Sequence, residues 1–302
     1  MKIVFLDCSY VNPGDIPWDA IERNGQLEFY NTSTPSEGTE RMKDADVVIV
    51  DKFVIGRDLI EKSPKLKLIA VAATGYNNID LDAAKENGIG VVNVPAYSTD
   101  SVAQHTFALI LALTNQVAGL DQMVGKGEWV PARKSVYDAL PLTLLAGKSI
   151  GIIGFGNIGK KVSEIAEAFG MTVNIYSKNR EAAIKSDIVT LHCPLNDDTD
   201  NMVNAEFISN MKDGALLINT ARGGLVDESA LLDGIKSGKL GGVGLDVITE
   251  EPTDKDPIFH LPNVLITPHI AFAPVEIRGK IVSITGGNIE AFVKGENLNR
   301  LV

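Results

Sequence analysis

Residues 149–162, with the sequence SIGIIGFGNIGKKV, constrain this chain more than any other stretch. An isoleucine-rich run, typical of a buried strand, leads through three glycines into apolar residues at helical spacing. Gly154, Gly156 and Gly159 fit the pattern G-x-G-x-x-G. In that pattern the first glycine permits a tight turn, the second lets the backbone approach a pyrophosphate, and the third packs the helix on the strand. A plain glycine-rich turn is the alternative, but the order of strand, glycines and helix favours a dinucleotide-binding site.

The helix that starts in this stretch is a second reason to expect a phosphate. Its first amide N–H groups have no partner inside the helix, and the helix dipole places a partial positive charge there. Phe155, Asn157 and Ile158 lie between the glycines, so we expect them to line the cofactor site as well.

The composition of the 302 residues is that of a globular protein and argues against several functional classes. Hydrophobic residues make up 45% and charged residues 22% of the chain, which is enough to bury a core. The net charge of -11 argues against a nucleic-acid partner, which requires a basic surface. Cys8 and Cys193 lack metal-ligand spacing, so we expect no metal and a reducing compartment. With no signal peptide and no apolar run of membrane-spanning length, the sequence predicts a cytoplasmic protein.

Strands and helices alternate along the chain, which predicts doubly wound parallel sheets of the α/β class. The first series has strands at 2–7, 27–30, 45–51, 66–72 and 90–94, with helices at 18–23, 57–62 and 81–87. After a long helix at 98–113, the second series has strands at 149–153, 172–176, 187–191, 215–219, 242–246 and 264–267, with helices at 158–169, 204–211 and 228–237. A last helix at 275–294 is expected to return to the first series. We therefore predict a dinucleotide-binding domain, 98–274, inserted into a substrate domain of 1–97 and 275–302.

Three further motifs place polar side chains where strands of the second series end. Arg222 follows a buried strand and precedes two glycines, Glu251 precedes a proline, and His269 lies in the sequence Thr-Pro-His. Ligands bind at the carboxyl ends of strands in an open α/β sheet, so these three side chains are candidates for one cleft. Taken singly, Arg222 could be part of a surface ion pair, Glu251 one residue of an acidic loop, and His269 a turn histidine.

In the order of these motifs the chain resembles the D-isomer-specific 2-hydroxyacid dehydrogenases from about residue 40 to about residue 290. The resemblance implies a Rossmann-type cofactor domain inserted in a flavodoxin-like substrate domain. It also implies a catalytic and substrate-binding arginine at Arg222, a glutamate at Glu251 and an acid/base histidine at His269.

The chemistry of a 2-oxo acid accounts for these residue types. The rigid donor fork of Arg222 can hold the carboxylate and the ketone. His269 can donate a proton to the alkoxide that forms when a hydride arrives, and Glu251 beside it would favour the imidazolium and orient the ring.

The resemblance also implies substrate contacts in the first domain. The loop containing Thr74 and Gly75 corresponds to the family loop that clamps the substrate carboxylate, although it also reads as a strand-to-helix turn. Lys52 matches a pocket position of hydroxypyruvate and glyoxylate reductases, and an exposed lysine at a strand end fits it equally well. His105 lies where many relatives have a Glu-His pair, and we expect it to be structural.

The residues after the second cofactor-domain strand bear on cofactor choice. NAD-binding proteins commonly have an acidic residue there, but this chain has Ser177, Lys178 and Arg180. Serine and cations would bind a 2′-phosphate that a carboxylate would repel, so we expect NADP to be preferred over NAD; a solvated loop is the alternative. The segment 177–187 is also shorter than in relatives, which usually fit a helix and a short strand there. The family pattern implies further cofactor contacts at Cys193, Pro194, Thr220, Ala221 and Asp246.

The sequence thus predicts an oxidoreductase that interconverts a small 2-oxo acid and a D-2-hydroxy acid, with hydroxypyruvate or glyoxylate favoured. The alternatives are phosphoglycerate dehydrogenase, or a nucleotide-sensing binding module such as the corepressors of the same family. The resemblance further implies a homodimer, with the helix from residue 98 and the segment 121–140 at its interface. We expect neither a nucleic acid nor a membrane as a partner.

Overall fold

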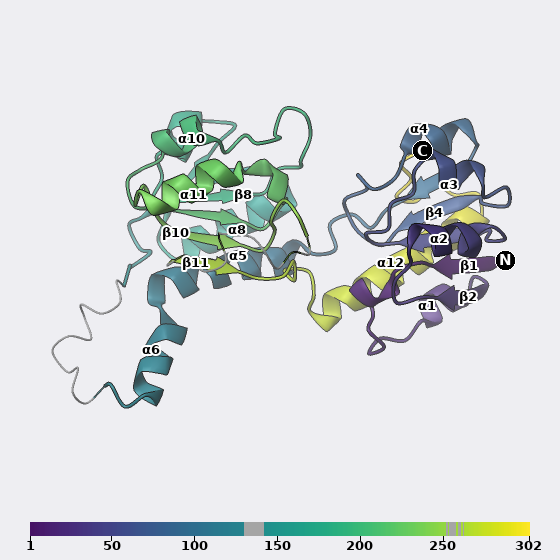
Figure 1. Ribbon diagram of the computed structural model, residues 1–302, viewed down its shortest axis with the longest axis horizontal. Coiled ribbons are helices and arrows are strands. Elements are labelled where there is room, and N and C mark those ends of the chain that lie inside the picture. The colour runs from purple at the N-terminus through teal and green to yellow at the C-terminus, as the bar shows by residue number, and fades with distance from the viewer. Residues whose placement is uncertain (130–141, 252, 254–257, 259–260, 262) are drawn as a thin grey trace. The chain divides into compact units, whose positions relative to one another are not determined.

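The computed structural model of this chain describes residues 1–129, 142–251, 253, 258, 261 and 263–302 (Figure 1). The chain divides into two compact units. One contains Met1–Ser98 together with Ala273–Val302, and the other contains Thr99–Phe272. Each unit is built on its own parallel sheet with helices on both faces, which confirms the predicted fold class.

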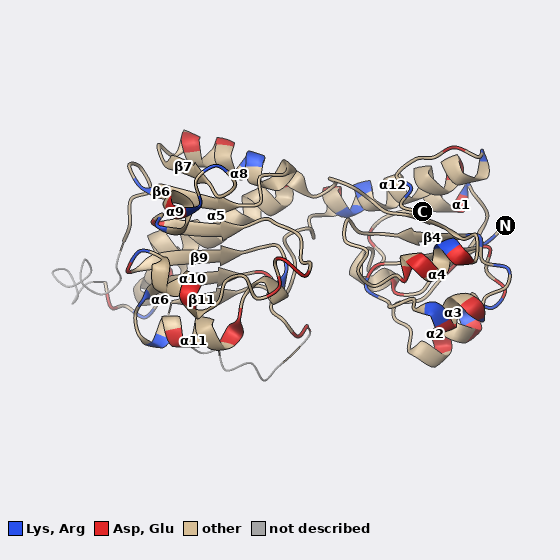
Figure 2. Cartoon of the chain, turned by 90° about the horizontal axis from the view of Figure 1, so that it is seen from above, with Lys and Arg blue, Asp and Glu red and all other residues tan. Residues whose placement is uncertain are grey.

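The first unit contains a five-stranded sheet in the order β2-β1-β3-β4-β5, the flavodoxin-like order. Its strands are β1 (Lys2–Phe5), β2 (Gln26–Phe29), β3 (Val47–Val50), β4 (Leu68–Val71) and β5 (Gly90–Val92). All side chains of β3 and β4 are buried, because helices cover both faces of a parallel sheet. One face is covered by α1 (Asp19–Glu22) and α12 (Val275–Val293), the other by α2 (Pro35–Met42), α3 (Arg57–Glu61) and α4 (Leu81–Glu86) (Figure 2).

The second unit contains a six-stranded sheet in the order β11-β10-β9-β8-β6-β7. Its strands are β6 (Ser149–Ile153), β7 (Thr172–Ile175), β8 (Ile188–Leu191), β9 (Ala215–Asn219), β10 (Leu240–Leu245) and β11 (Val264–Ile266). The strand order reverses at β6, which pairs with β7 on one side and β8 on the other. Such a switch point is where open α/β sheets bind ligands, and the glycine motif follows β6 directly.

Two apolar layers hold this sheet between helices. On one face α5 (Thr99–Asn115) and α8 (Asn157–Ala168) pack on buried residues of β6, β8 and β9. On the other, α9 (Arg180–Ile184), α10 (Ala205–Asn210) and α11 (Glu228–Lys236) cover the same strands together with β10. A further helix, α6 (Val117–Gly125), follows α5 after a left-handed residue at Gln116 and has no buried side chain.

The short segment between β7 and β8 has a direct effect on topology. Only the five-residue helix α9 fits there, started by Asn179, whose side chain accepts the N–H of Ala182 at 3.1 Å. A Rossmann sheet has another strand outside the second one. Here β7 is the edge strand of the sheet, because α9 leads straight into β8.

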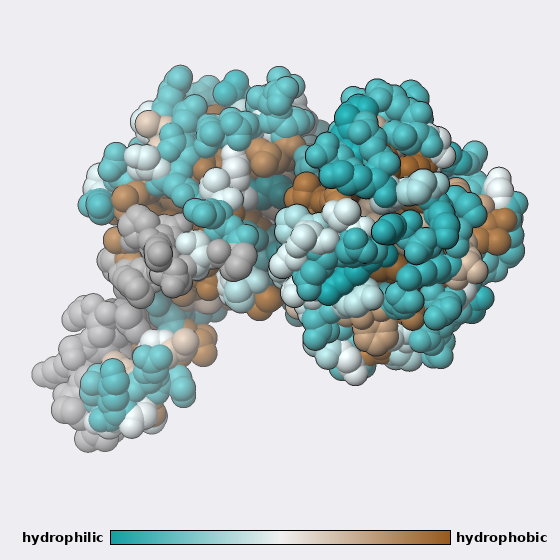
Figure 3. All heavy atoms as spheres, turned by 45° about the vertical axis from the view of Figure 1, so that its right-hand side comes forward, coloured by the Kyte–Doolittle hydropathy of each residue, from teal (hydrophilic) through white to brown (hydrophobic). Residues whose placement is uncertain are grey.

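Basic and acidic residues both occur along the helices α2 and α3 (Figure 2). Arg41 pairs with Glu37 and Arg57 with Glu61, each four residues apart. Hydrophilic residues cover most of the face shown in Figure 3. Among the described residues no single helix is long and apolar enough to cross a membrane, although α5 and α6, bent by 52° to each other, reach that length and composition as a pair.

Candidate functional site

The three glycines after β6 have three different surroundings. Gly154 has a φ of +94°, and a Cβ there would lie 2.4 Å from the backbone nitrogen of Cys193. At Gly159 a Cβ would lie 2.1 Å from the carbonyl oxygen of Gly154, so the helix start packs directly on the turn. At Gly156 no atom lies within 4 Å of the position of a Cβ. That open space, at the start of α8, fits a pyrophosphate that approaches the backbone closely.

The loop after β7 carries the residues predicted to select the cofactor. Ser177, Lys178 and Arg180 are all exposed, and the Arg180 guanidinium lies 5.4 Å from the centre of the Tyr176 ring. These are donors and cations without a carboxylate among them, as the sequence indicated. Their donors and positive charges suit a phosphate group.

The residues after β8 close the other side of the turn. The Cys193 thiol points to the Met202 sulfur at 3.8 Å, and burial raises the pKa of Cys193. Next to it, His192 contacts the Thr190 hydroxyl at 3.0 Å through Nε2, and burial lowers the pKa of His192 to about 3. His192 is therefore a neutral part of the fold at pH 7. Pro194 is exposed beside these residues.

Glu251 and His269 form a close pair, with Glu251 Oε2 2.6 Å from His269 Nδ1. The other Glu251 oxygen accepts the N–H of Ile248 at 2.9 Å, which holds the carboxylate in place. With Nδ1 bonded to the carboxylate, Nε2 is the nitrogen that His269 can present to a reacting group. This is the arrangement of an oriented acid/base histidine.

The loop that carries Arg222 packs against the loop that carries Glu251. A Cβ on Gly223 would lie 2.0 Å from the backbone of Ile248, so glycine is required for this approach. Asn219, at the end of β9, ties the same loop from within: its side chain donates to the Arg222 carbonyl at 2.8 Å and accepts the Ala221 N–H at 3.0 Å. Sequence reasoning missed Asn219, although a buried polar residue at a strand end is the signal for such a tie.

Asp246 anchors the segment on which His269 lies. Its buried carboxylate accepts the N–H groups of Ile270 and Ala271, both at 2.9 Å, and the Thr267 hydroxyl at 2.6 Å. Burial raises the pKa of Asp246, but these bonds and the contact with His105 outweigh burial and lower the pKa below its ordinary value. Asp246 is therefore an ionised anchor. His269 itself has a φ of +54°, which is rare for a residue with a side chain and is typical of strained functional sites.

The predicted substrate residues of the first unit lie on two loops at the carboxyl ends of β3 and β4. Lys52 is exposed, and its ammonium lies 5.1 Å from the centre of the Tyr10 ring. Thr74 donates its hydroxyl to the Val94 carbonyl at 2.8 Å, which fixes the loop that continues into Gly75. The loop after β3 is held by buried Asp7, which accepts the N–H groups of three consecutive residues, 51 to 53, at 2.7–2.9 Å. Sequence reasoning did not identify this role of Asp7.

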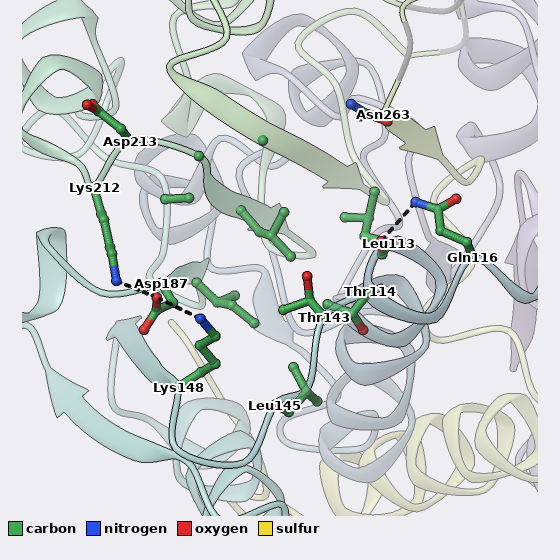
Figure 4. A pocket seen from close by; sticks show the side chains of 15 residues that line it. Leu113, Thr114, Gln116, Thr143, Leu145, Lys148, Asp187, Lys212, Asp213 and Asn263 are labelled. Atoms are coloured by element: carbon green, nitrogen blue, oxygen red, sulfur yellow. Dashed lines mark hydrogen bonds and ion pairs between the residues drawn. The ribbon is translucent and has the colours of Figure 1, made fainter. Parts of the chain in front are cut away.

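A separate cavity of about 360 Å³ lies at the opposite, amino edge of the second unit's sheet (Figure 4). Lys148 and Lys212 both point to Asp187 at its rim, and Leu113 and Leu145 contribute apolar walls. It is remote from the glycine turn, which lies at the carboxyl edge, so it is not the site described above. Across the described parts of the chain, no group of three or more histidine, cysteine, aspartate or glutamate side chains is arranged to hold a metal ion.

The glycine turn, the Arg222 loop and the Glu251–His269 pair all follow carboxyl ends of strands in one parallel sheet, and therefore share one edge. A sheet with a dinucleotide turn at its switch point and an oriented histidine at the same edge defines a dinucleotide-dependent oxidoreductase.

Comparison with known proteins narrows this class. Residues 107–271 match the family described as D-isomer specific 2-hydroxyacid dehydrogenase, NAD binding domain. The chain is 39% identical to a hydroxypyruvate reductase of Blautia hydrogenotrophica, over 99% of each chain. It is 40% identical to a glycerate dehydrogenase of Methylorubrum extorquens, over 99% of this chain and 98% of the relative. A solved acyclic imino acid reductase in complex with NADPH and D-Arg is 33% identical, with a TM-score of 0.88 and full coverage of both chains.

The chain belongs to the D-isomer-specific 2-hydroxyacid dehydrogenase family. This confirms the family, the enzyme class and the nicotinamide cofactor that the sequence predicted. The individual site residues and the preference for NADP stay predictions.

Proposed function

We propose that this protein reduces a small 2-oxo acid to the D-2-hydroxy acid, with hydroxypyruvate or glyoxylate as substrate and NADPH as the preferred cofactor. The observation that carries the proposal is the 2.6 Å contact between Glu251 and His269, at the sheet edge that also holds the glycine turn. The names of the two relatives, hydroxypyruvate reductase and glycerate dehydrogenase, support the substrate class.

The turn at Gly154, Gly156 and Gly159 would hold the nicotinamide cofactor, which when bound would supply the hydride for C2 of the oxo acid. His269 donates the proton from Nε2 to the ketone oxygen, so that C–H and O–H bonds form as the C=O π bond breaks. Glu251 holds the ring through Nδ1, which leaves Nε2 for the substrate. Arg222 binds the substrate carboxylate and ketone through its planar donor fork. From the first unit we assign substrate contacts to Lys52, Thr74 and Gly75.

Replacement of His269 and Glu251 tests this assignment. We expect His269→Ala to lower kcat for hydroxypyruvate or glyoxylate by about 10²–10⁴-fold, the range typical of a lost general acid. Glu251→Gln keeps the shape but loses the charge, so it should lower kcat by a smaller factor and leave cofactor affinity unchanged. The assay is steady-state oxidation of NADPH and NADH against hydroxypyruvate, glyoxylate, pyruvate and a bulkier 2-oxo acid. Full activity of His269→Ala on the preferred substrate would refute the assigned acid.

The preference for NADPH rests on Ser177, Lys178 and Arg180, which offer a hydroxyl and two cations where NAD-binding sheets commonly have a carboxylate. The NADPH bound to the imino acid reductase supports the same choice. We expect Arg180→Ala to raise the KM for NADPH by about tenfold, the loss of one charge-assisted bond, and to leave the KM for NADH unchanged. Lys185→Ala is the control, because this exposed lysine lies at the other end of the same helix and pairs with Glu181. A wild-type enzyme that prefers NADH would overturn this part of the proposal.

Two other readings make different predictions in the same assay. A nucleotide-sensing module would bind the cofactor tightly and turn over none of the 2-oxo acids. A phosphoglycerate dehydrogenase would oxidise 3-phosphoglycerate faster than glycerate. Turnover of unphosphorylated hydroxypyruvate or glyoxylate that disappears in His269→Ala separates our proposal from both.

We also propose a cytoplasmic homodimer. The sequence placed its interface on the helix from residue 98 and on 121–140, of which 130–140 lie outside the described residues. Residues 121–125 of that segment belong to α6, where Val124 is 46% exposed. Val117, at the start of the same helix and just before the segment, is 66% exposed, and a second copy would cover both valines. Sedimentation equilibrium should give twice the chain mass of 32.4 kDa, and Val117→Asp with Val124→Asp should shift it to the monomer. A wild-type monomer would contradict this proposal.

A further inference from the structure

Two consecutive residues of α5, His105 and Thr106, contact the two loops that carry Arg222 and His269. The helix packs against the glycines of β10. A Cβ on Gly244 would lie 3.0 Å from the side chain of Leu109, so a larger residue would push α5 away. This close packing brings polar side chains of α5 within hydrogen-bond reach of the strand ends.

His105 meets the loop of His269 through Thr267. Its Nε2 lies 2.8 Å from the Thr267 hydroxyl oxygen and 3.4 Å from Asp246 Oδ1. The Thr267 hydroxyl donates its hydrogen to Asp246 Oδ1 at 2.6 Å, because an ionised carboxylate only accepts. The Thr267 oxygen must therefore accept from His105, which requires the proton on Nε2. The hydrogen bonds therefore run from the His105 N–H to the Thr267 hydroxyl and from that hydroxyl to Asp246. Thr267 lies two residues before His269.

Thr106 meets the loop of Arg222 in the same way. Its hydroxyl donates to the Val102 carbonyl at 2.8 Å, within the helix. The contact with the Thr220 hydroxyl at 3.0 Å must then have Thr220 as the donor and Thr106 as the acceptor. Thr106 is fully buried and Thr220 is 8% exposed, so bulk solvent has little access to this bond. Thr220 lies two residues before Arg222.

We propose that His105 and Thr106 are positioning residues of the active site, each holding one functional side chain through a threonine two residues before it. His105 sets the loop of His269, and Thr106 sets the loop of Arg222. This inference rests on the proposed function, because the roles of His269 and Arg222 decide what each contact changes. A displacement of about 1 Å in a catalytic group can cost about a hundredfold in rate. The two contacts should therefore affect different kinetic constants.

The kinetic test uses a disruptive and a conservative variant at each position. We expect His105→Leu to lower kcat by about 10–100-fold with the KM for the 2-oxo acid nearly unchanged, because the proton donor is misplaced. His105→Gln keeps an N–H donor of similar reach and should recover most of the lost kcat.

Thr106→Val removes the acceptor of Thr220 without changing shape, and should raise the KM for the 2-oxo acid about tenfold. Thr106→Ser keeps the hydroxyl and should restore the wild-type KM. Gln104→Ala, at the exposed neighbouring position, is the control.

Hydrogen–deuterium exchange provides a readout that does not depend on turnover. His105→Leu should speed amide exchange at Ile270 and Ala271 about tenfold or more, and Thr106→Val should do the same at Ala221, with other amides of residues 99–272 unchanged. Global loss of protection, or equal loss of activity in the leucine and glutamine variants, would show a purely structural role and overturn the inference. So would wild-type kinetics in His105→Leu and Thr106→Val. If the wild type turns over no 2-oxo acid, the proposed function fails. The local pattern of amide exchange would still decide whether His105 and Thr106 position the two loops.

Discussion

At the scale of single residues, Gly154 and Gly156 are required for different reasons. Gly154 has a left-handed backbone and no space for a Cβ, whereas Gly156 has ordinary geometry and open space on that side. We expect Gly154→Ala to destabilise the apo protein by more than about 1 kcal/mol, from strain and overpacking. Gly156→Ala should leave the apo protein stable but weaken NADPH binding about tenfold or more, because the methyl group occupies the approach of the pyrophosphate.

Thermal unfolding without cofactor and fluorescence titration with NADPH separate the two effects. Gly56→Ala is the control, because Gly56 also precedes a helix with an extended backbone and a Cβ there would meet nothing within 4 Å. Equal loss of apo stability in both glycine variants of the turn would mean that Gly156 is structural, and would remove the argument for its role in binding.

At the scale of elements, Asp187 joins the starts of three strands at the amino edge of the second unit's sheet. Its carboxylate accepts the N–H and hydroxyl of Ser149, both at 2.9 Å. It also accepts the ammonium of Lys212 at 2.6 Å (Figure 4). Burial raises the pKa of Asp187, but these partners outweigh burial and lower the pKa to about 2. The ionised group therefore stabilises the fold at neutral pH.

The sign of this linkage gives a pH-dependent prediction. Because the folded pKa lies below the unfolded value of about 4, the stabilisation is complete above pH 4 and is lost as pH falls toward 2. We expect Asp187→Asn to lower the free energy of unfolding by about 2 kcal/mol at pH 7, the size that such a shift implies. The difference from wild type should shrink below pH 4 in urea titrations. A difference that stays constant from pH 7 to pH 3 would contradict this account.

The helix α12 offers a matched pair of adjacent glycines. A Cβ on Gly286 would lie 2.1 Å from the carbonyl oxygen of Ala20 in α1, whereas a Cβ on Gly287 would meet nothing within 4 Å. Gly286→Ala should therefore separate α1 from α12 and cost about 1–3 kcal/mol. Gly287→Ala should stabilise by about 0.5–1 kcal/mol, since alanine is the better helix former. Urea unfolding of both variants is the measurement, and similar effects at the two positions would show that α1 does not pack as described.

At the scale of the whole molecule, one unit is formed by a continuous segment of the chain and the other by two separate segments. Thr99–Phe272 is continuous, while the other unit needs Met1–Ser98 and Ala273–Val302 together, because α12 packs on α1 and β4. We expect a fragment of residues 99–272 to fold alone and to bind NADPH without turning over a 2-oxo acid. A fragment of residues 1–98 should not fold cooperatively. Circular dichroism, thermal unfolding and NADPH fluorescence test both fragments, and an unfolded 99–272 fragment would contradict the prediction.

Local patterns predicted much of the fold. The bounds of the strands at 149–153 and 215–219 were predicted to the residue, since a short apolar run bounded by polar or glycine residues is typical of a buried strand. Apolar periodicity did not predict α2, although Thr34 and Glu37 form a capping box and Pro35 occupies the first helical position. Nor did it predict α6 and α9, because so few turns leave little periodicity to detect. Missed helices were therefore short or weakly amphipathic.

The sequence by itself determined the family, the dinucleotide turn and the identity of the candidate arginine, glutamate and histidine, because each depends on neighbours within a few positions. Only the tertiary structure decided that His105 reaches Thr267, 162 positions away, and that Thr106 reaches Thr220, 114 positions away. It alone showed that Asp7 holds the backbone of residues 51 to 53. Such bonds depend on which strand ends become neighbours when the chain folds, and that pairing is a property of the whole sheet.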